Sequence, residues 1–169
     1  CDARGMYLRS GVGIGSRSVS VRSVGEVTKD FEPIVQTPKS SLINLYEIEP
    51  GERYLLVINI HGRNRGGLVP FQMQLESLSS YIEVHEGPII FGGDFNTNNK
   101  KKRDFLRAFV GRHGLEEIQF ESDYRTRAKI SRLPLDYVFV RDLAVENAEV
   151  LKDIHGSDHQ PIQISARLN

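Results

Sequence analysis

The segment at residues 88–97, PIIFGGDFNT, constrains the fold of this chain more than any other stretch. An apolar run typical of a buried strand leads into two glycines and then into Asp94 and Asn96. A carboxylate at the end of a buried strand needs a partner, because burying an unpaired charge is costly. The segment therefore predicts a strand whose end faces polar side chains from elsewhere in the chain.

The patterns around this segment predict a chain in which strands and helices alternate. Two amphipathic helices are expected at residues 67–87 and 99–114, and each ends at a glycine that suits a helix stop. This order indicates layers of sheet and helix, and therefore an α+β fold. The other expected elements are extended strands within 10–25, a hairpin at 40–62, strands at 133–142 and 148–154, and a loop leading into a last strand over 155–169.

The length and charge of the chain narrow its class. With 169 residues, we expect a single domain over residues 1–169. Lys plus Arg and Asp plus Glu both number 22, and a formal net charge of zero argues against binding nucleic acid through bulk positive charge. A net charge of zero is still compatible with an enzyme that has a local basic groove. The one cysteine, Cys1, excludes an internal disulfide, and the apolar runs are too short to span a bilayer.

Polar side chains lie at the ends of four predicted strands. In two of these strands the polar residues are two positions apart, so they share one face of the strand. Loops at strand ends are where sheet proteins usually carry their chemistry. Where such ends converge, carboxylates can hold a hard cation, a His–Asp pair can hold a proton, and amides can orient water or phosphate oxygen. The residues are Asn59 and His61, Asp94 and Asn96, Asp136, and Asp158 and His159.

Each member of this set also has an ordinary structural explanation. Asp94 can be a turn former, because Asp and Asn side chains bond their own backbone. His61 alone is more often a hydrogen-bonded core histidine, and Asp158 with His159 can be a loop pair. Asp136 is harder to explain in this way, because it interrupts an apolar strand. The set as a whole favours a metal-assisted site for phosphate esters.

Basic residues flank two of these strand ends. Two arginines closely follow His61, and four cations precede the strand that contains Asp136. They can take the phosphates of a substrate, and the ordinary surface charge of a neutral protein explains them equally well. The candidates for phosphate contact are Asn59, Arg63, Arg65, Arg125 and Arg127, with Lys129 and Arg132 beside the last two.

Four motifs in a fixed order, INIHG, GGDFNT, LDYVFV and GSDHQPI, resemble the endonuclease/exonuclease/phosphatase superfamily, whose members are similar to deoxyribonuclease I. The stretch SGVGIGSR also matches a strand of that family, and the likeness covers nearly the whole chain from Ser10 onward. The resemblance implies a layered α/β-sandwich of the deoxyribonuclease I-like type. It also implies hydrolysis of a phosphoester by water, in line and without a covalent intermediate, with Mg²⁺ or Mn²⁺ as cofactor.

The same resemblance implies roles for the residues around the attacking water. Asp94 is similar to the residue that orients or deprotonates this water, and it is expected to share the metal with Asp158. Asn96 is expected to hold the phosphate or the water. His61 is similar to a histidine that acts on the leaving-group side.

A second implied pair stabilises the phosphate. Asp136 is expected to pair with the ring of His159 and to fix its tautomer. His159 is then expected to contact the scissile phosphate and to stabilise its developing charge.

The family pattern also contains two earlier motifs, an Asn at the end of the first strand and a Gln-Glu pair whose Glu is the main metal ligand. Both belong before the SGVGIGSR strand, so the main Glu ligand is expected upstream of Cys1; neither Glu47 nor Glu76 is expected to replace it. We therefore expect an N-terminally incomplete domain with weak metal binding and little activity by itself. An exposed sheet edge is expected to favour self-association or association with an N-terminal piece.

The superfamily fold does not give the substrate. The leading expectation is a nuclease-like, metal-dependent phosphodiesterase whose partner is a phosphoester, with nucleic acid as the favoured one. A phosphatase or a lipid phosphodiesterase of the same superfamily is the alternative enzyme. A non-catalytic binding protein on this fold is the alternative from another class.

Overall fold

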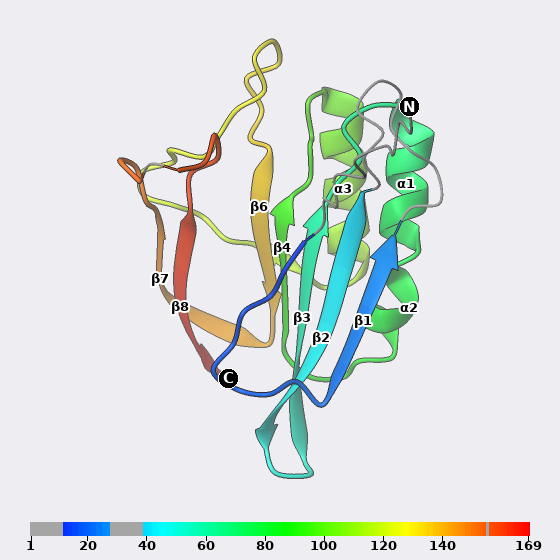
Figure 1. Cartoon of the computed structure of the whole chain (residues 1–169), viewed down its shortest axis with the longest axis vertical. Coiled ribbons are helices and arrows are strands. Elements are labelled where there is room, and N and C mark those ends of the chain that lie inside the picture. The colour runs from blue at the N-terminus through cyan, green and yellow to red at the C-terminus, as the bar shows by residue number, and fades with distance from the viewer. Residues whose placement is uncertain (1–11, 28–38, 155) are drawn as a thin grey trace, which may run out of the picture.

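The computed structural model describes residues 12–27, 39–154 and 156–169, so Cys1 lies outside the described residues. Its centre is a six-stranded sheet with strand order β1-β2-β3-β4-β6-β5 (Figure 1). β3 and β4 are parallel, and all other neighbours in this sheet are antiparallel. The strands are β1 (Arg22–Val27), β2 (Ser40–Glu49), β3 (Arg53–His61), β4 (Ile89–Asp94), β5 (Glu116–Glu117) and β6 (Asp136–Arg141).

Three helices form a layer on one side of this sheet, and a separate two-stranded sheet lies away from them (Figure 1). This arrangement of strands and helices confirms the predicted α+β class. Among the described residues, no helix has the length and apolar character needed to cross a membrane. The helices are α1 (Leu68–Glu76), α2 (Ser79–Glu83) and α3 (Lys100–Arg112), and the second sheet pairs β7 (Leu143–Val150) with β8 (Ile162–Leu168).

The core lies between the helices and the six-stranded sheet. Phe71 from α1 and Phe109 from α3 are buried against sheet residues such as Ile58 and Phe91. The ring of Phe91 also meets the ring of Phe95 edge to face at 5.0 Å. Because Phe95 directly follows β4, this packing holds the end of β4 in place.

Two expected elements match the structure closely. The hairpin at 40–62 is confirmed as β2 and β3, joined by a turn at Pro50–Glu52. The helix expected at 99–114 is confirmed as α3. It starts after Asn99, whose side-chain oxygen accepts a hydrogen bond from the backbone N–H of Lys102 at 3.1 Å, as a good N-cap does.

The single helix expected at 67–87 was wrong, because the structure divides this segment into α1 and α2. The break lies at Ser77 and Leu78. The hydroxyl of Ser77 donates to the carbonyl of Gln74 at 2.9 Å, and the N–H of Leu78 bonds only three residues back, to Leu75. Serine side chains that compete for the backbone weaken a helix interior, and apolar spacing alone did not show this.

Two other expected strands also differ from the structure. The strand expected at 148–154 is β7, which begins at Leu143 and ends at Val150. A register shift between Val145 and Asn147 interrupts the two-residue period that identifies a strand in a sequence. Within 10–25, only the last part is a strand, because β1 begins at Arg22; residues 10–11 lie outside the described part.

The buried His113 is expected to make the fold sensitive to acid. Burial lowers the pKa of His113 from its usual 6.5, and the charge of Arg112 lowers it further. The unfolded chain therefore binds more protons than the folded chain as the pH falls below 6.5, so stability is lost on the acid side. In urea titrations at about pH 7.5 and about pH 5.5, we expect a His113→Gln variant to lose less stability on acidification than the wild type. Equal losses in both proteins would contradict this.

Candidate active site

Three polar side chains stand side by side at one end of the six-stranded sheet. In the strand register, His61 at the end of β3 pairs with Asp94 at the end of β4, and Asp94 pairs with Asp136 at the start of β6. Residues that are direct cross-strand neighbours point to the same face of a sheet. The register therefore places an imidazole and two carboxylates in one row.

Asp94 is surrounded by hydrogen-bond donors. The backbone N–H of Asn96 donates to its Oδ1 at 2.8 Å, and the side-chain amide of Asn96 donates to its Oδ2 at 2.9 Å. The same amide donates to the carbonyl of Gly62 at 3.0 Å, and Asn96 takes a left-handed backbone conformation with φ 51°. Asp94 therefore forms a turn with Asn96 and also belongs to the row. The structural and the functional explanation of its sequence context do not exclude each other.

The side chains of His61 and Asp94 are partly exposed to solvent. Nε2 of His61 lies 3.6 Å from Oδ2 of Asp94, and the two side chains are 36% and 21% exposed. Asn96, by contrast, is buried with its amide bonded to Asp94 and Gly62. The geometry therefore makes Asn96 a residue that fixes the carboxylate of Asp94, rather than one that faces solvent.

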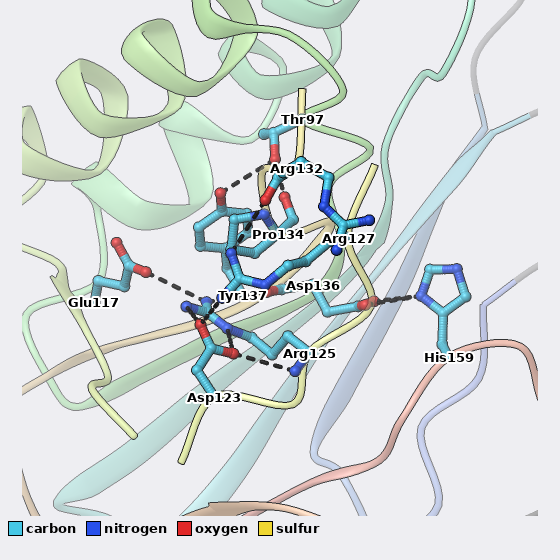
Figure 2. A network of polar contacts seen from close by, with 10 residues as sticks. All are labelled: Thr97, Glu117, Asp123, Arg125, Arg127, Arg132, Pro134, Asp136, Tyr137 and His159. Carbon is cyan, nitrogen blue, oxygen red and sulfur yellow. Dashed lines mark hydrogen bonds and ion pairs between the residues drawn. The ribbon is translucent and has the colours of Figure 1, made fainter. Parts of the chain in front are cut away.

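His159 reaches the row from the loop between β7 and β8. Its Nδ1 lies 2.8 Å from Oδ2 and 2.9 Å from Oδ1 of Asp136, and Figure 2 shows the ring turned toward this carboxylate. Burial raises the pKa of Asp136 to about 6, although the charge of His159 lowers it. Burial alone would lower the pKa of His159, but the charge of Asp136 and the hydrogen bond to it raise that pKa overall. The pair therefore favours a charged imidazolium next to the row.

Asp94, Asp136 and His159 form a cluster that fits a divalent cation. Each offers a ligand atom, and these atoms lie within 4.8 Å of one another. Carboxylate oxygens are the donors that Mg²⁺ and Mn²⁺ prefer, whereas Nδ1 of His159 already faces Asp136. Asp158, expected as a metal ligand, is exposed and outside this cluster. Its backbone oxygen accepts from Thr126, and its charge helps to raise the pKa of His159.

Arg125, expected to contact phosphate, supports the start of β6 instead (Figure 2). Its guanidinium holds the carboxylate of Asp123 through two bonds, 2.9 Å from Nε to Oδ1 and 3.0 Å from Nη2 to Oδ2. Nη1 donates to Glu117 at 3.3 Å and to the backbone oxygen of Asp136 at 3.2 Å. The guanidinium also lies 5.0 Å from the ring of Tyr137. Arg125 is thus a buried cation with two carboxylate partners, and it stabilises the structure around the start of β6.

The other expected phosphate contacts are distributed differently. Arg127 pairs with Asp123 at 2.7 Å, and the amide of Asn59 donates to the backbone oxygen of Gly13 at 3.0 Å. Arg63 is 6% exposed, whereas Arg65 is exposed. The structure therefore brings together His61 and the Asp94 cluster, and of the five candidates Arg65 and Arg127 are exposed.

Two buried polar side chains that the sequence did not indicate hold the loop after β3. Gln74 of α1 accepts from the N–H of Arg63 at 2.9 Å and donates to the carbonyl of His61 at 3.1 Å. Lys102 of α3 donates to the carbonyls of Arg63 and Asn64 at 2.6 and 2.8 Å. Both lie on helix faces that also carry core residues, so the one available signal was a polar residue at a core position.

The loop after β4 and the start of β6 are tied together by Thr97 (Figure 2). Its hydroxyl donates to the carbonyl of Pro134 at 2.6 Å and lies 3.2 Å from the hydroxyl of Tyr137. Another residue to which the sequence assigned no role, Lys39, lies with Nζ 2.7 Å from Nε2 of His61. Nothing in the sequence around Lys39 distinguishes it from a surface lysine.

This sheet, with its helix layer and its row of polar side chains at one end, defines an α+β protein of the deoxyribonuclease I-like type. Its solved neighbours agree. An endonuclease/exonuclease/phosphatase from Bacteroides vulgatus superposes with a TM-score of 0.71 at 15% identity, covering 90% of this chain and 67% of that one. The sequence pattern of the endonuclease/exonuclease/phosphatase family matches residues 7–159, and the chain belongs to this family.

Sequence relatives extend this assignment. A UPF0294 protein of Yersinia enterocolitica is 39% identical over 137 residues, which are 80% of this chain and 51% of that protein. A UPF0294 protein of Vibrio parahaemolyticus is 36% identical over 165 residues, 96% of this chain and 57% of its own length. The chain thus spans about half the length of the curated relatives it matches.

Structural neighbours with named activities share the fold at low identity. A mannosyl-6-phosphatase of Bacteroides thetaiotaomicron has a TM-score of 0.65 at 16% identity, covering 89% of this chain and 67% of that one. The catalytic domain of human nocturnin has a TM-score of 0.55 at 20% identity, covering 87% of this chain and 60% of that one.

Proposed function

We propose that this protein is a metal-dependent phosphodiesterase of nuclease type that uses Mg²⁺ or Mn²⁺. One observation carries the proposal: the strand register and the His159 loop bring Asp94, Asp136 and His159 within 4.8 Å, with His61 in the same row. Members of the family are hydrolases that act on phosphoesters. The proposal goes beyond this family property in two respects: the substrate is a phosphodiester, with nucleic acid favoured, and the metal is Mg²⁺ or Mn²⁺.

The carboxylates of Asp94 and Asp136 would hold the cation. When bound there, a divalent cation polarises a phosphoryl oxygen and lowers the pKa of a bound water. Asp94 orients or deprotonates the attacking water, and Asn96 keeps the carboxylate in place through its two bonds to it. The charge of Asp158, beside His159, adds to the negative field of the site.

His159 stabilises the charge that develops on the phosphate. Its Nδ1 is held by Asp136, so the other ring nitrogen is available to donate to a phosphoryl oxygen. The raised pKa keeps the imidazolium populated toward neutral pH. His61, with Nε2 3.6 Å from Oδ2 of Asp94, is proposed to act on the leaving group of the same phosphate.

A plasmid-nicking assay on the full-length protein tests this function. With Mg²⁺ or Mn²⁺ we expect relaxed and linear DNA to accumulate, and EDTA should stop the reaction because the carboxylates then lack their cation. His159→Ala should lower the rate roughly 10²- to 10³-fold, the usual effect of removing one transition-state donor. A wild type that cleaves no better than His159→Ala with either metal would reject the proposal and favour a binding protein.

A phosphatase or lipid phosphodiesterase would use the same row of residues. The neighbouring mannosyl-6-phosphatase makes a phosphomonoester the first alternative to test. Rates on p-nitrophenyl phosphate (a monoester), on bis(p-nitrophenyl) phosphate (a soluble diester) and on sphingomyelin vesicles (a lipid diester) separate the three classes. We expect the soluble diester to be preferred.

Self-association through the edge strands β1 or β5 can be followed in the same samples by light scattering.

A further inference from the structure

Lys39 lies at the edge of the row, although it does not belong to β3, β4 or β6. It immediately precedes β2, and β2 runs antiparallel to β3 with Ser41 opposite Ile60, so the start of β2 lies next to the end of β3. Its side chain is buried, with Lys39 8% exposed, and Nζ lies 2.7 Å from Nε2 of His61. A buried lysine with its ammonium on a site histidine is not an ordinary surface charge.

The chemistry of this contact decides which ring nitrogen of His61 carries the proton. A lysine ammonium has three N–H donors and no acceptor. At 2.7 Å it can bond Nε2 only if that nitrogen offers its lone pair. The proton of His61 must then be on Nδ1, and Nε2 has none to donate toward Asp94, from which it is 3.6 Å away.

We propose that Lys39 is a further positioning residue of the site: it holds His61 in the Nδ1–H tautomer and supplies the positive charge on the leaving-group side of Asp94. The inference deepens the proposed function, since the charge matters only if a phosphate binds there. Two carboxylates, Asp94 and Asp136, already lie in the row, and a fixed cation beside them lowers the cost of bringing in a further anion. The tautomer, however, can be observed without any substrate.

Nitrogen-15 NMR of the histidine rings tests the tautomer directly, with the His61 signals assigned from a His61→Gln variant. In the wild type at mildly alkaline pH, we expect Nε2 of His61 to show the shift of an unprotonated nitrogen and Nδ1 that of a protonated one. Lys39→Met, which keeps length but removes the donors, should move the proton toward Nε2. Lys39→Arg keeps a cationic donor and should preserve the wild-type pattern.

A protonated Nε2 in the wild type would overturn the inference, and so would an unchanged tautomer in a folded Lys39→Met protein. The wild-type spectrum decides even if Lys39→Met fails to fold. In the nicking assay, Lys39→Met should lower kcat about 10- to 100-fold with little change in KM. This is the usual effect of removing a hydrogen-bond partner that orients a residue of the site. Lys39→Arg should recover much of the rate.

A matched control is Lys101→Met on the exposed surface of α3, which should leave both kcat and the histidine spectra unchanged. The outcomes also separate the two proposals. If the wild type cleaves no phosphoester but Nε2 of His61 is unprotonated and responds to Lys39→Met, the proposed function fails and the tautomer assignment stands. If cleavage occurs and Nε2 is protonated, the role of Lys39 fails alone.

Discussion

Gly93→Ala is expected to lower the free energy of unfolding by about 3 kcal/mol or more, because it combines overpacking with backbone strain. Gly93 has φ +136°, a conformation that side chains rarely adopt. A methyl carbon there would overlap the carbonyl oxygen of Ile60 on β3 and would lie 2.8 Å from Oδ1 of Asn59. Since β3 and β4 pair in parallel at this point, the strands would have to separate beside Asp94.

Urea denaturation measures this loss, and Gly25→Ala is the matched control. Gly25 is also a strand glycine, in the edge strand β1, but an added methyl carbon there meets nothing within 4 Å. The control should change stability by less than about 1 kcal/mol, as glycine-to-alanine changes do at compatible positions. Similar midpoints for Gly93→Ala and Gly25→Ala would show that the close approach of the two strands does not constrain residue 93.

Asp94→Asn is expected to have the largest effect on activity, a loss of roughly 10²- to 10⁴-fold in kcat/KM, because it removes the proposed general base and a proposed metal-binding charge together. The amide has the size of the carboxylate, so core packing is preserved. It cannot accept from both donors of Asn96, which lie 2.8 and 2.9 Å from the two carboxylate oxygens. We therefore also expect weaker binding of Mn²⁺ by calorimetry.

The control for this change is Asp104→Asn on α3. The side chain of Asp104 is 50% exposed and pairs with the neighbouring Arg103, away from the row. Asp104→Asn removes the same charge from the chain as Asp94→Asn does, so a general effect of net charge would appear in both variants. If Asp94→Asn kept more than a tenth of the wild-type kcat/KM while folded, Asp94 would not be the base.

Strand-end patterns in the sequence pointed to the three residues that the structure aligns in the row. His61, Asp94 and Asp136 each sit where an apolar run gives way to a polar residue, and the strand register then aligns them. Local periodicity carries this information, since it tells which residues belong to strands and where those strands end. His159 was grouped with these strand ends, but the structure places it in the loop between β7 and β8.

The partners of the basic residues could not be predicted in the same way. Arg125 and Arg127 lie before the Asp136 strand, as a phosphate-binding pair would, but both bond to Asp123. Their partner is only two to four residues away, yet a charged residue in a loop has many equally spaced alternatives. Lys39 presents the reverse case: its contact with His61 depends on the pairing of β2 with β3, and no local pattern records it.

The row of His61, Asp94 and Asp136 divides the sequence into positions whose change would move these side chains and positions whose change would not. These residues are successive rungs across three strands, so their spacing is set by strand pairing and not by the lengths of the connecting segments at residues 62–88 and 95–135, which contain the three helices and β5. Exposed loop positions in these segments, such as Lys129 and Ile130, can therefore change without moving the row. One residue inserted within β4 would instead turn Asp94 to the opposite face of the sheet.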